Sequence, residues 1–170
     1  MNIKLRAVEL EDKDLIYEWE NLFELWEVSS TTRPFSHFAI ETYVRSCQDA
    51  DIYSEGQIRL MIDMQEQDKT FTVGCVDLFN IDAQHLRAEV GLFIASEYRG
   101  RHIAKQTMEQ LFSYATHILN LNQIYAFIPQ DNAWCIKLFE NLGYKYSATL
   151  QQWIKRGKTY LNVLVYQKIV

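Results

Sequence analysis

The segment EYRGRHIA, residues 97–104, lies between an apolar run that ends at Ile94 and the most clearly amphipathic stretch of the chain, residues 103–119. The apolar run predicts a strand, and the helical spacing that follows predicts a helix. Free backbone N–H groups at a helix start attract anions, and the helix dipole adds to this attraction. Arg99 and Arg101 add positive charge. The segment therefore predicts a phosphate-binding turn, although it matches neither the GxGxxG nor the Walker pattern.

Periodic patterns on both sides of this turn predict the other elements. Strands are expected at 3–7, 58–64, 71–79, 88–94, 124–128, 144–155 and 159–169. Helices are expected at 15–26, 36–45, 103–119 and 132–142, and loops at 29–34 and 49–56. The resulting order, β-α-α-β-β-β-α-β-α-β-β, predicts an α/β (α+β) fold with a mixed central sheet and helices on both faces.

The composition predicts a single domain over residues 1–170. With 48% apolar residues, the chain can bury one core of ordinary size. Its net charge of −5 argues against a nucleic-acid partner, because phosphate contacts need a basic face. No apolar run approaches the ~18 residues of a membrane span, so we expect a cytoplasmic protein without membrane contact. The three cysteines and four histidines lack metal-ligand spacing, so no structural metal is expected.

A second motif lies downstream, where Asn132 opens a helix that closes on Leu-Gly-Tyr at 142–144. Together with the turn RGRHIA at 99–104, this motif resembles the GCN5-related N-acetyltransferases, the GNAT family, whose acetyl-CoA motif reads [RQ]-x-x-G-x-[GA]. The resemblance runs in register from Phe71 to Tyr144, with His102 in place of the middle glycine. It is strongest to ribosomal-protein N-terminal acetyltransferases and bacterial spermidine/spermine N-acetyltransferases.

The resemblance implies a GNAT-like, mostly antiparallel sheet and acetyl-CoA as cofactor. The backbone of the strand before the turn would face the pantetheine arm, and Asn132 would hydrogen-bond that arm near the thioester. These strand residues are Leu92, Phe93 and Ile94, and the turn residues that would hold the pyrophosphate are Arg99, Gly100, Arg101, His102, Ile103 and Ala104. His102 either takes a positive φ or keeps helical dihedrals with only its N–H facing the phosphate. Trp134 is expected either to stack near the coenzyme or to pack against the sheet or an oligomer surface.

The same resemblance suggests catalytic residues. Glu89 occupies the position of a glutamate that takes the amine proton, although it could instead pair with Arg87 or another cation at the sheet surface. The usual tyrosine acid is replaced by Phe139. Cys135 stands where some relatives carry serine, and it is either a thiol acid or a small core residue. Two further phenols lie nearby in the sequence, Tyr98 and Tyr144.

The acceptor is expected at the first helices and the loop between them. Glu20, Glu24 and Glu27 share one face if the helix continues, and Trp26 would add a cation–π contact with a cationic amine. The alternative is a solvated acidic face with Trp26 in the core. Arg33 would mark the edge of the acceptor loop.

These observations predict an N-acetyltransferase that acts on a primary amine, either a polyamine-like small molecule or a protein N-terminus. Two other functions stay open at this point: an acyl-CoA-binding protein with little or no turnover, suggested by His102 and Phe139, and an interaction protein that kept the fold alone. A homo-oligomer is possible, with Trp153 and Tyr160 on the last strands as candidate contacts or as walls of the acceptor groove.

Overall fold

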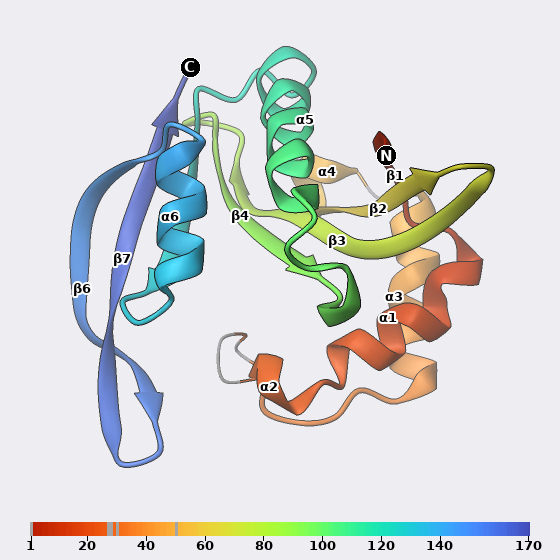
Figure 1. The fold of residues 1–170 in the computed structure, drawn as a ribbon, viewed down its shortest axis with the longest axis horizontal. Coiled ribbons are helices and arrows are strands. Elements are labelled where there is room, and N and C mark those ends of the chain that lie inside the picture. Colours follow the sequence, from red (N-terminus) through yellow and green to blue (C-terminus); the bar gives the residue numbers. More distant parts are fainter. Residues whose placement is uncertain (1, 27–28, 30, 50) are drawn as a thin grey trace.

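A seven-stranded sheet runs through the protein in the order β1-β2-β3-β4-β5-β7-β6 (Figure 1). The computed structural model describes residues 2–26, 29, 31–49 and 51–170. The strands are β1 Asn2–Ala7, β2 Ile58–Glu66, β3 Lys69–Asp82, β4 Arg87–Ile94, β5 Gln123–Pro129, β6 Lys145–Arg156 and β7 Thr159–Ile169. Every neighbouring pair is antiparallel except β4 and β5. The predicted mixed, mostly antiparallel sheet is therefore confirmed.

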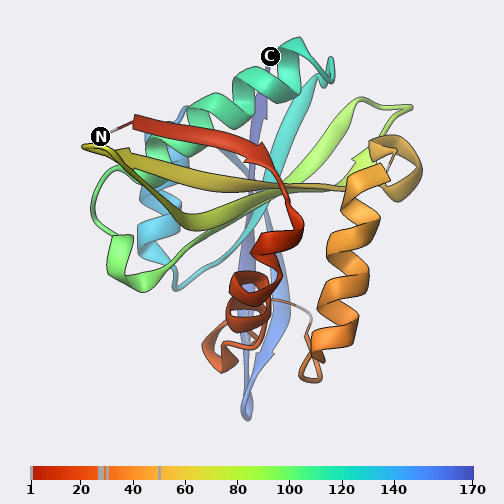
Figure 2. The ribbon, with the colours of Figure 1, turned by 90° about the vertical axis from the view of Figure 1, so that its right-hand side faces the viewer.

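Helices cover both faces of this sheet, as predicted. The helices are α1 Lys13–Glu20, α2 Phe23–Trp26, α3 His37–Asp49, α4 Ile52–Glu55, α5 Ile103–His117 and α6 Ala133–Asn141, with 3-10 turns at Leu10–Asp12 and Ser96–Tyr98. Viewed along the sheet edge, α5 lies on one side and α1 and α3 lie on the other (Figure 2). None of the described helices is long and apolar enough to cross a membrane.

Two hydrophobic cores correspond to these two faces. The larger core packs the apolar stripe of α5, including Met108 and Leu111, against β2 to β5 and α6. The smaller core packs Ile16 of α1 and Val44 of α3 against Met61 of β2. In α5, α1 and α3 the apolar residues recur with the 3.6-residue period of a helix. Burial of this apolar side fixes which face each helix turns to the sheet.

The first helix is shorter than predicted. It ends at Glu20, because the side chain of Asn21 bonds the backbone: its amide donates to the carbonyls of Tyr17 (3.0 Å) and Phe35 (3.2 Å), and its carbonyl oxygen accepts the Phe35 N–H (2.9 Å). Such side-chain bonds compete with helix continuation. The expectation of one helix through residue 26, with Glu20 and Glu24 on one face, is therefore wrong.

The stretch 49–56, predicted as a loop, contains the short helix α4. Its start is capped by Asp51, whose carboxylate accepts the N–H of Tyr53 at 3.3 Å. Its end is set by Gly56, which has φ 66° and so takes the left-handed conformation that stops a helix. A cap residue followed five positions later by glycine was the signal in the sequence for this helix.

Strands β4 and β5 separate soon after they meet. Only three residue pairs join them, from Arg87 opposite Gln123 to Glu89 opposite Tyr125. Beyond that point β4 stays paired with β3 as far as Ile94, and β5 stays paired with β7. Within the described part of the chain, the inner edges of the two strands therefore present backbone N–H and C=O groups that no sheet partner takes up.

Candidate active site

The turn between β4 and α5 contains two residues with positive φ. Gly100 has φ 79°, and His102, the residue before the first turn of α5, has φ 61° and ψ 13°. Of the two conformations expected for His102, the left-handed one is correct, although it costs a residue with a Cβ about 1–2 kcal/mol. The first bond into α5 runs from the Gln106 N–H to the His102 carbonyl, which leaves the N–H groups of 103–105 without helical partners. The turn thus keeps the shape that glycine would provide and offers donors to an anion.

A cavity of about 380 Å³ opens between this turn and α6. The predicted cofactor residues that line it are Ile94, Arg99, Gly100, His102, Ile103 and Ala104. The opposite wall is one face of α6, formed by Trp134, Lys137, Leu138, Asn141 and Leu142. Free backbone donors on one side and the separated β4 and β5 edges nearby fit a pyrophosphate followed by an extended chain that carries amides.

Two lysines and a tryptophan of this cavity complete its cationic and apolar lining. Lys105 stands at the start of α5, and Lys137 stands one turn after Trp134 on α6. Trp134 is 57% exposed, so it does not belong to the core. Sequence reasoning missed both lysines and left Trp134 undecided. For α6, the signal in the sequence was the i, i+3, i+7 spacing of residues 134, 137 and 141, which places Trp134 and Lys137 on one helix face.

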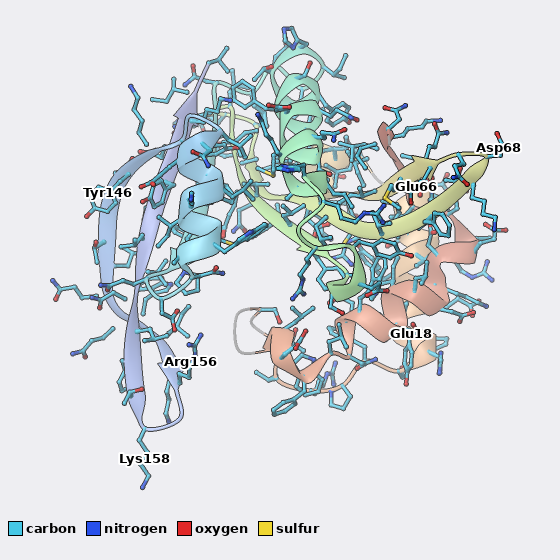
Figure 3. All side chains as sticks on the ribbon, in the orientation of Figure 1. Glu18, Glu66, Asp68, Tyr146, Arg156 and Lys158 are labelled. Carbon is cyan, nitrogen blue, oxygen red and sulfur yellow. The ribbon has the colours of Figure 1, made fainter. Side chains whose placement is uncertain are left out.

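Four of the predicted cofactor residues, including Arg99 of the cavity lining, make contacts within the protein. Arg101 points to the β2–β3 hairpin and pairs with Glu66 at 2.7 Å; Figure 3 marks Glu66 near the end of that hairpin. Arg99 donates from Nε to the Ile94 carbonyl at 3.0 Å, which ties the turn to the end of β4. Phe93 turns to the smaller core, with its ring 5.2 Å from that of Trp19. The remaining strand residue, Leu92, packs against the larger core.

The Asn132 side chain caps α6. Its Oδ1 accepts the N–H of Cys135 at 3.1 Å. A hydrogen bond from the Asn132 side chain lowers the pKa of the Cys135 thiol and partly offsets the effect of burial on it. The Cys135 side chain packs against the larger core and is partly buried, and this burial raises the pKa of the thiol above its usual value. The thiol therefore stays protonated at neutral pH.

The aromatic residues at or near the candidate acid positions differ in burial, and one of them, Tyr98, reaches the cavity. Phe139 is buried, with its ring 4.8 Å from that of Tyr144 in an edge-on contact. The Tyr144 hydroxyl is buried and has no hydrogen-bond partner among the described residues, and burial raises its pKa well above the ordinary range. Tyr98 does line the cavity, beside Phe71 at 6.5 Å between ring centres.

Glu89 lies at the last backbone pair between β4 and β5. It is 9% exposed, and its neighbours across the strands are Phe79 and Tyr125. Desolvation among these groups raises the pKa of the carboxyl, partly offset by a hydrogen bond from Asn80 Nδ2 to Oε2 at 2.9 Å. The alternative that Glu89 pairs with Arg87 is wrong, because Arg87 pairs with Asp82 at 3.0 Å.

The predicted acceptor residues lie on α2 and the loop after it. Glu24 and Arg33 are exposed. Trp26 is only partly buried, with its indole N–H donating to the Glu20 carbonyl at 3.0 Å, so it is not a core residue. Glu27 lies outside the described residues. Glu24 and Arg33 are thus open to solvent, and none of the described acceptor candidates makes a hydrogen bond with Glu89.

A second cavity of about 400 Å³ lies on the α3 side of the sheet and was not foreseen from the sequence. Its lining includes Tyr43, Glu55, Arg59, Asp77 and Asn80. Arg59 binds Asp77 through two bonds of 2.7 and 2.9 Å and binds Glu20 at 2.6 Å. Two carboxylates therefore bind one guanidinium, and Glu55 adds a further negative charge to the lining, so the surplus negative charge favours a cationic ligand. Asn80 also reaches Glu89, so this cavity lies one side chain away from the candidate base.

No group of three or more histidine, cysteine or acidic side chains gathers as a metal site in the part of the chain that the structure describes. The candidate site described above consists of a buried carboxylate, a partly buried thiol and a turn suited to an anionic cofactor.

Comparison with known proteins identifies an acetyltransferase domain in this chain. The model of the acetyltransferase (GNAT) domain matches residues 2–145. The spermidine N(1)-acetyltransferase of Escherichia coli (strain K12) is 24% identical over 165 residues, 96% of this chain and 83% of that protein. The uncharacterized N-acetyltransferase p20 of Bacillus licheniformis is 28% identical over 170 residues, 96% of this chain and 90% of that protein.

Solved structures share the fold. The spermidine N-acetyltransferase from Vibrio cholerae in complex with CoA and spermine superposes with a TM-score of 0.83 at 23% identity, covering 98% of this chain and 95% of that chain. A dodecameric structure of the enzyme from the same organism gives a TM-score of 0.79 at 23% identity, covering 98% and 93%. The predicted acetyl-CoA-dependent enzyme class and cofactor are confirmed by the domain match, and the chain belongs to the GNAT family of acetyltransferases.

Proposed function

We propose that this chain moves the acetyl group of acetyl-CoA to a primary amine, with Glu89 as the base. The observation that carries the proposal is the position of Glu89, a nearly buried carboxylate at the point where β4 and β5 separate. A carboxyl whose pKa is raised by desolvation is a better proton acceptor near neutral pH than an exposed one.

The cofactor would be held by backbone and charge together. The inner edge of β4 at 92–94 would face the pantetheine amides, and the turn 99–104 would hold the pyrophosphate. Lys105 and Lys137 would add positive charge at the phosphates from the two walls of the cavity. The side-chain amide of Asn132 would donate to the arm near the thioester.

When bound, acetyl-CoA supplies the thioester carbonyl that an uncharged amine can attack. An ammonium loses two protons on its way to an amide. Glu89 takes the first, directly or through a water, and later releases it to solvent. The protonated thiol of Cys135 is the candidate that would give a proton to the departing sulfur, and the second amine proton would then return to Cys135. The products are the amide, the thiol and one proton, so the charges balance.

The acceptor we propose is a polyamine-like small molecule. Relatives of this chain are named spermidine acetyltransferases, and the cavity beside Asn80 has a surplus of carboxylates. A second ammonium of such an acceptor would bind at Glu55 and Asp77, whereas the sequence predicted an acceptor site at Glu24, Trp26, Glu27 and Arg33. Glu55→Gln is therefore expected to raise KM for spermidine about 3- to 10-fold while leaving KM for a monoamine unchanged. Glu24→Gln is the matched comparison, and an effect confined to that variant would favour the α2 surface instead.

The test of the activity is a rate assay with acetyl-CoA and a panel of spermidine, spermine, simple monoamines and N-terminal peptides. We expect the polyamines to be acetylated fastest and Glu89→Gln to lower kcat about 100-fold or more with little change in acetyl-CoA binding. Acetylation of the peptides alone would assign the enzyme to protein N-termini. Tight binding of acetyl-CoA without turnover of any amine would favour the binding-protein alternative.

We also propose self-association through the β6–β7 hairpin, which extends away from the rest of the sheet (Figure 1). Tyr146, Trp153 and Tyr160 are each more than half exposed there. A relative of the same fold is dodecameric by its own description. Light scattering of the native protein and of Trp153→Ser would test this, and an unchanged oligomer would exclude Trp153 from the contact. A cytoplasmic location stays a prediction from the sequence.

A further inference from the structure

A β-bulge interrupts the pairing of β3 with β4 beside Glu89. The register runs regularly from Gly74 opposite Ile94 to Phe79 opposite Glu89, and the next pair is Asp82 opposite Arg87. Two residues of β3 thus face a single residue of β4. Asn80, the first of the two, has φ 50°. Asparagine is among the few residues with a Cβ that take this conformation readily.

The bulge redirects the Asn80 side chain. In a regular strand, the residue after Phe79 would point to the face opposite that of Glu89, because side chains alternate. A bulge breaks this alternation and re-aims one side chain. Here the result is the 2.9 Å bond from Asn80 Nδ2 to Glu89 Oε2. No hydrogen bond reaches Oε1 from any of the described residues, so one oxygen is held and the other is left for a substrate proton.

We propose that Asn80 is the positioning residue of Glu89: it fixes one carboxylate oxygen so that the other faces the acceptor amine. This inference rests on the proposed function of Glu89 as the base. It requires that Glu89 have no other strong partner. Tyr125 faces it from β5, Phe79 lies opposite on β3, and the nearby Arg87 and Asp82 are paired with each other.

The bond has a defined effect on proton affinity. A donor to the carboxylate favours its charged form, whereas burial favours the neutral form. Removal of the Asn80 amide should therefore raise the pKa of Glu89 further. Activity that needs the ionised carboxylate would then begin at a higher pH.

Asn80→Gly is the main test, since glycine keeps the positive φ and removes only the side chain. We expect the acidic limb of the kcat/KM profile to move up by about 0.5–1 pH unit, kcat to fall and KM for acetyl-CoA to stay the same. Asn80→Asp, which keeps the size but removes the donor and adds a like charge, should move the limb further in the same direction. Asn120→Gly is the matched control, because Asn120 also has a positive φ (53°) but makes no bond to Glu89; it should leave the profile unchanged.

A second readout does not depend on turnover. The titration of Glu89, followed by carbon-13 NMR in the cofactor-free protein, should shift upward in Asn80→Gly and not in Asn120→Gly. If Glu89→Gln remains fully active, both the base assignment and this proposal fail. If Glu89→Gln is inactive while Asn80→Gly alters neither the pH profile nor the Glu89 titration, the base stands and only the role of Asn80 is overturned.

Discussion

Glu89 of β4 and Tyr125 of β5 face each other at the last backbone pair that joins these two strands. The position matters because β4 and β5 are paired on one side of it, whereas on the other side the two strands separate. A carboxylate placed there is desolvated by strands on both sides and still lies next to the opening that an extended cofactor needs. The geometry thus places the candidate base next to the strand edges that we propose as the cofactor site.

The ionisation of Glu89 should lower stability while it supports activity. Its pKa in the folded protein is raised above the unfolded value, so the folded state binds the proton more tightly. Stability from this group is therefore greatest at low pH and is lost as pH rises through the folded pKa. Glu89→Gln removes this loss, and its Tm relative to the wild type should be higher at pH 8 than at pH 4. Thermal melts at the two pH values check this; an equal difference at both would contradict a raised pKa.

Gly100 should be required for cofactor binding. Its φ of 79° strains any side chain, and Gly100→Glu adds a negative charge where the pyrophosphate is expected. We expect calorimetric titration to show loss of acetyl-CoA affinity of at least about 100-fold. Gly157→Glu is the control, because Gly157 also has a positive φ (60°) and open space around it but lies in the distant β6–β7 turn. Similar affinity in the two variants would remove the turn from the site.

His102 should tolerate glycine and reject a β-branched residue. Its φ of 61° is accessible to glycine without strain, whereas valine in this conformation is strongly disfavoured. His102→Gly should stay within about 1 kcal/mol of wild-type stability with acetyl-CoA affinity within twofold, and His102→Val should lose about 1–2 kcal/mol more than His102→Gly. Chemical denaturation of both variants measures the difference. Equal stability of the two would mean that this residue does not hold the left-handed conformation in solution.

Lys137 should contribute to cofactor affinity by charge. It lines the cavity from α6, and an accessible ion pair is worth about 0.2–1 kcal/mol, so Lys137→Gln should weaken acetyl-CoA binding about 2- to 5-fold. The loss should shrink at high salt, because exposed charges are screened. Lys158→Gln, at the tip of the β6–β7 hairpin (Figure 3), is the control and should have no effect. An equal loss in both variants would indicate a general charge effect rather than a contact.

The sequence was informative wherever a feature depends on residues close together in the chain. The seven strands, helix α5, the cap at Asn132 and the turn 99–104 follow from periodicity and cap chemistry within a few residues. The same local reasoning failed at Asn21 and at 49–56. At Asn21 a bond to the distant Phe35 ended the helix, and at 49–56 the cap and stop signals of a one-turn helix were read as a loop.

The amino-acid sequence by itself thus determined the order of the strands and of the main helices, and the place of the turn between β4 and α5, because strand and helix periods and helix caps are local properties. Only the tertiary structure decided where β4 leaves β5, that Arg59 binds both Glu20 and Asp77, and that Asn80 turns toward Glu89. These features depend on register and on contacts between segments far apart in the chain. A one-residue change of register reverses the face of every side chain in a strand, so the packing of the whole sheet has to be known before such neighbours can be named.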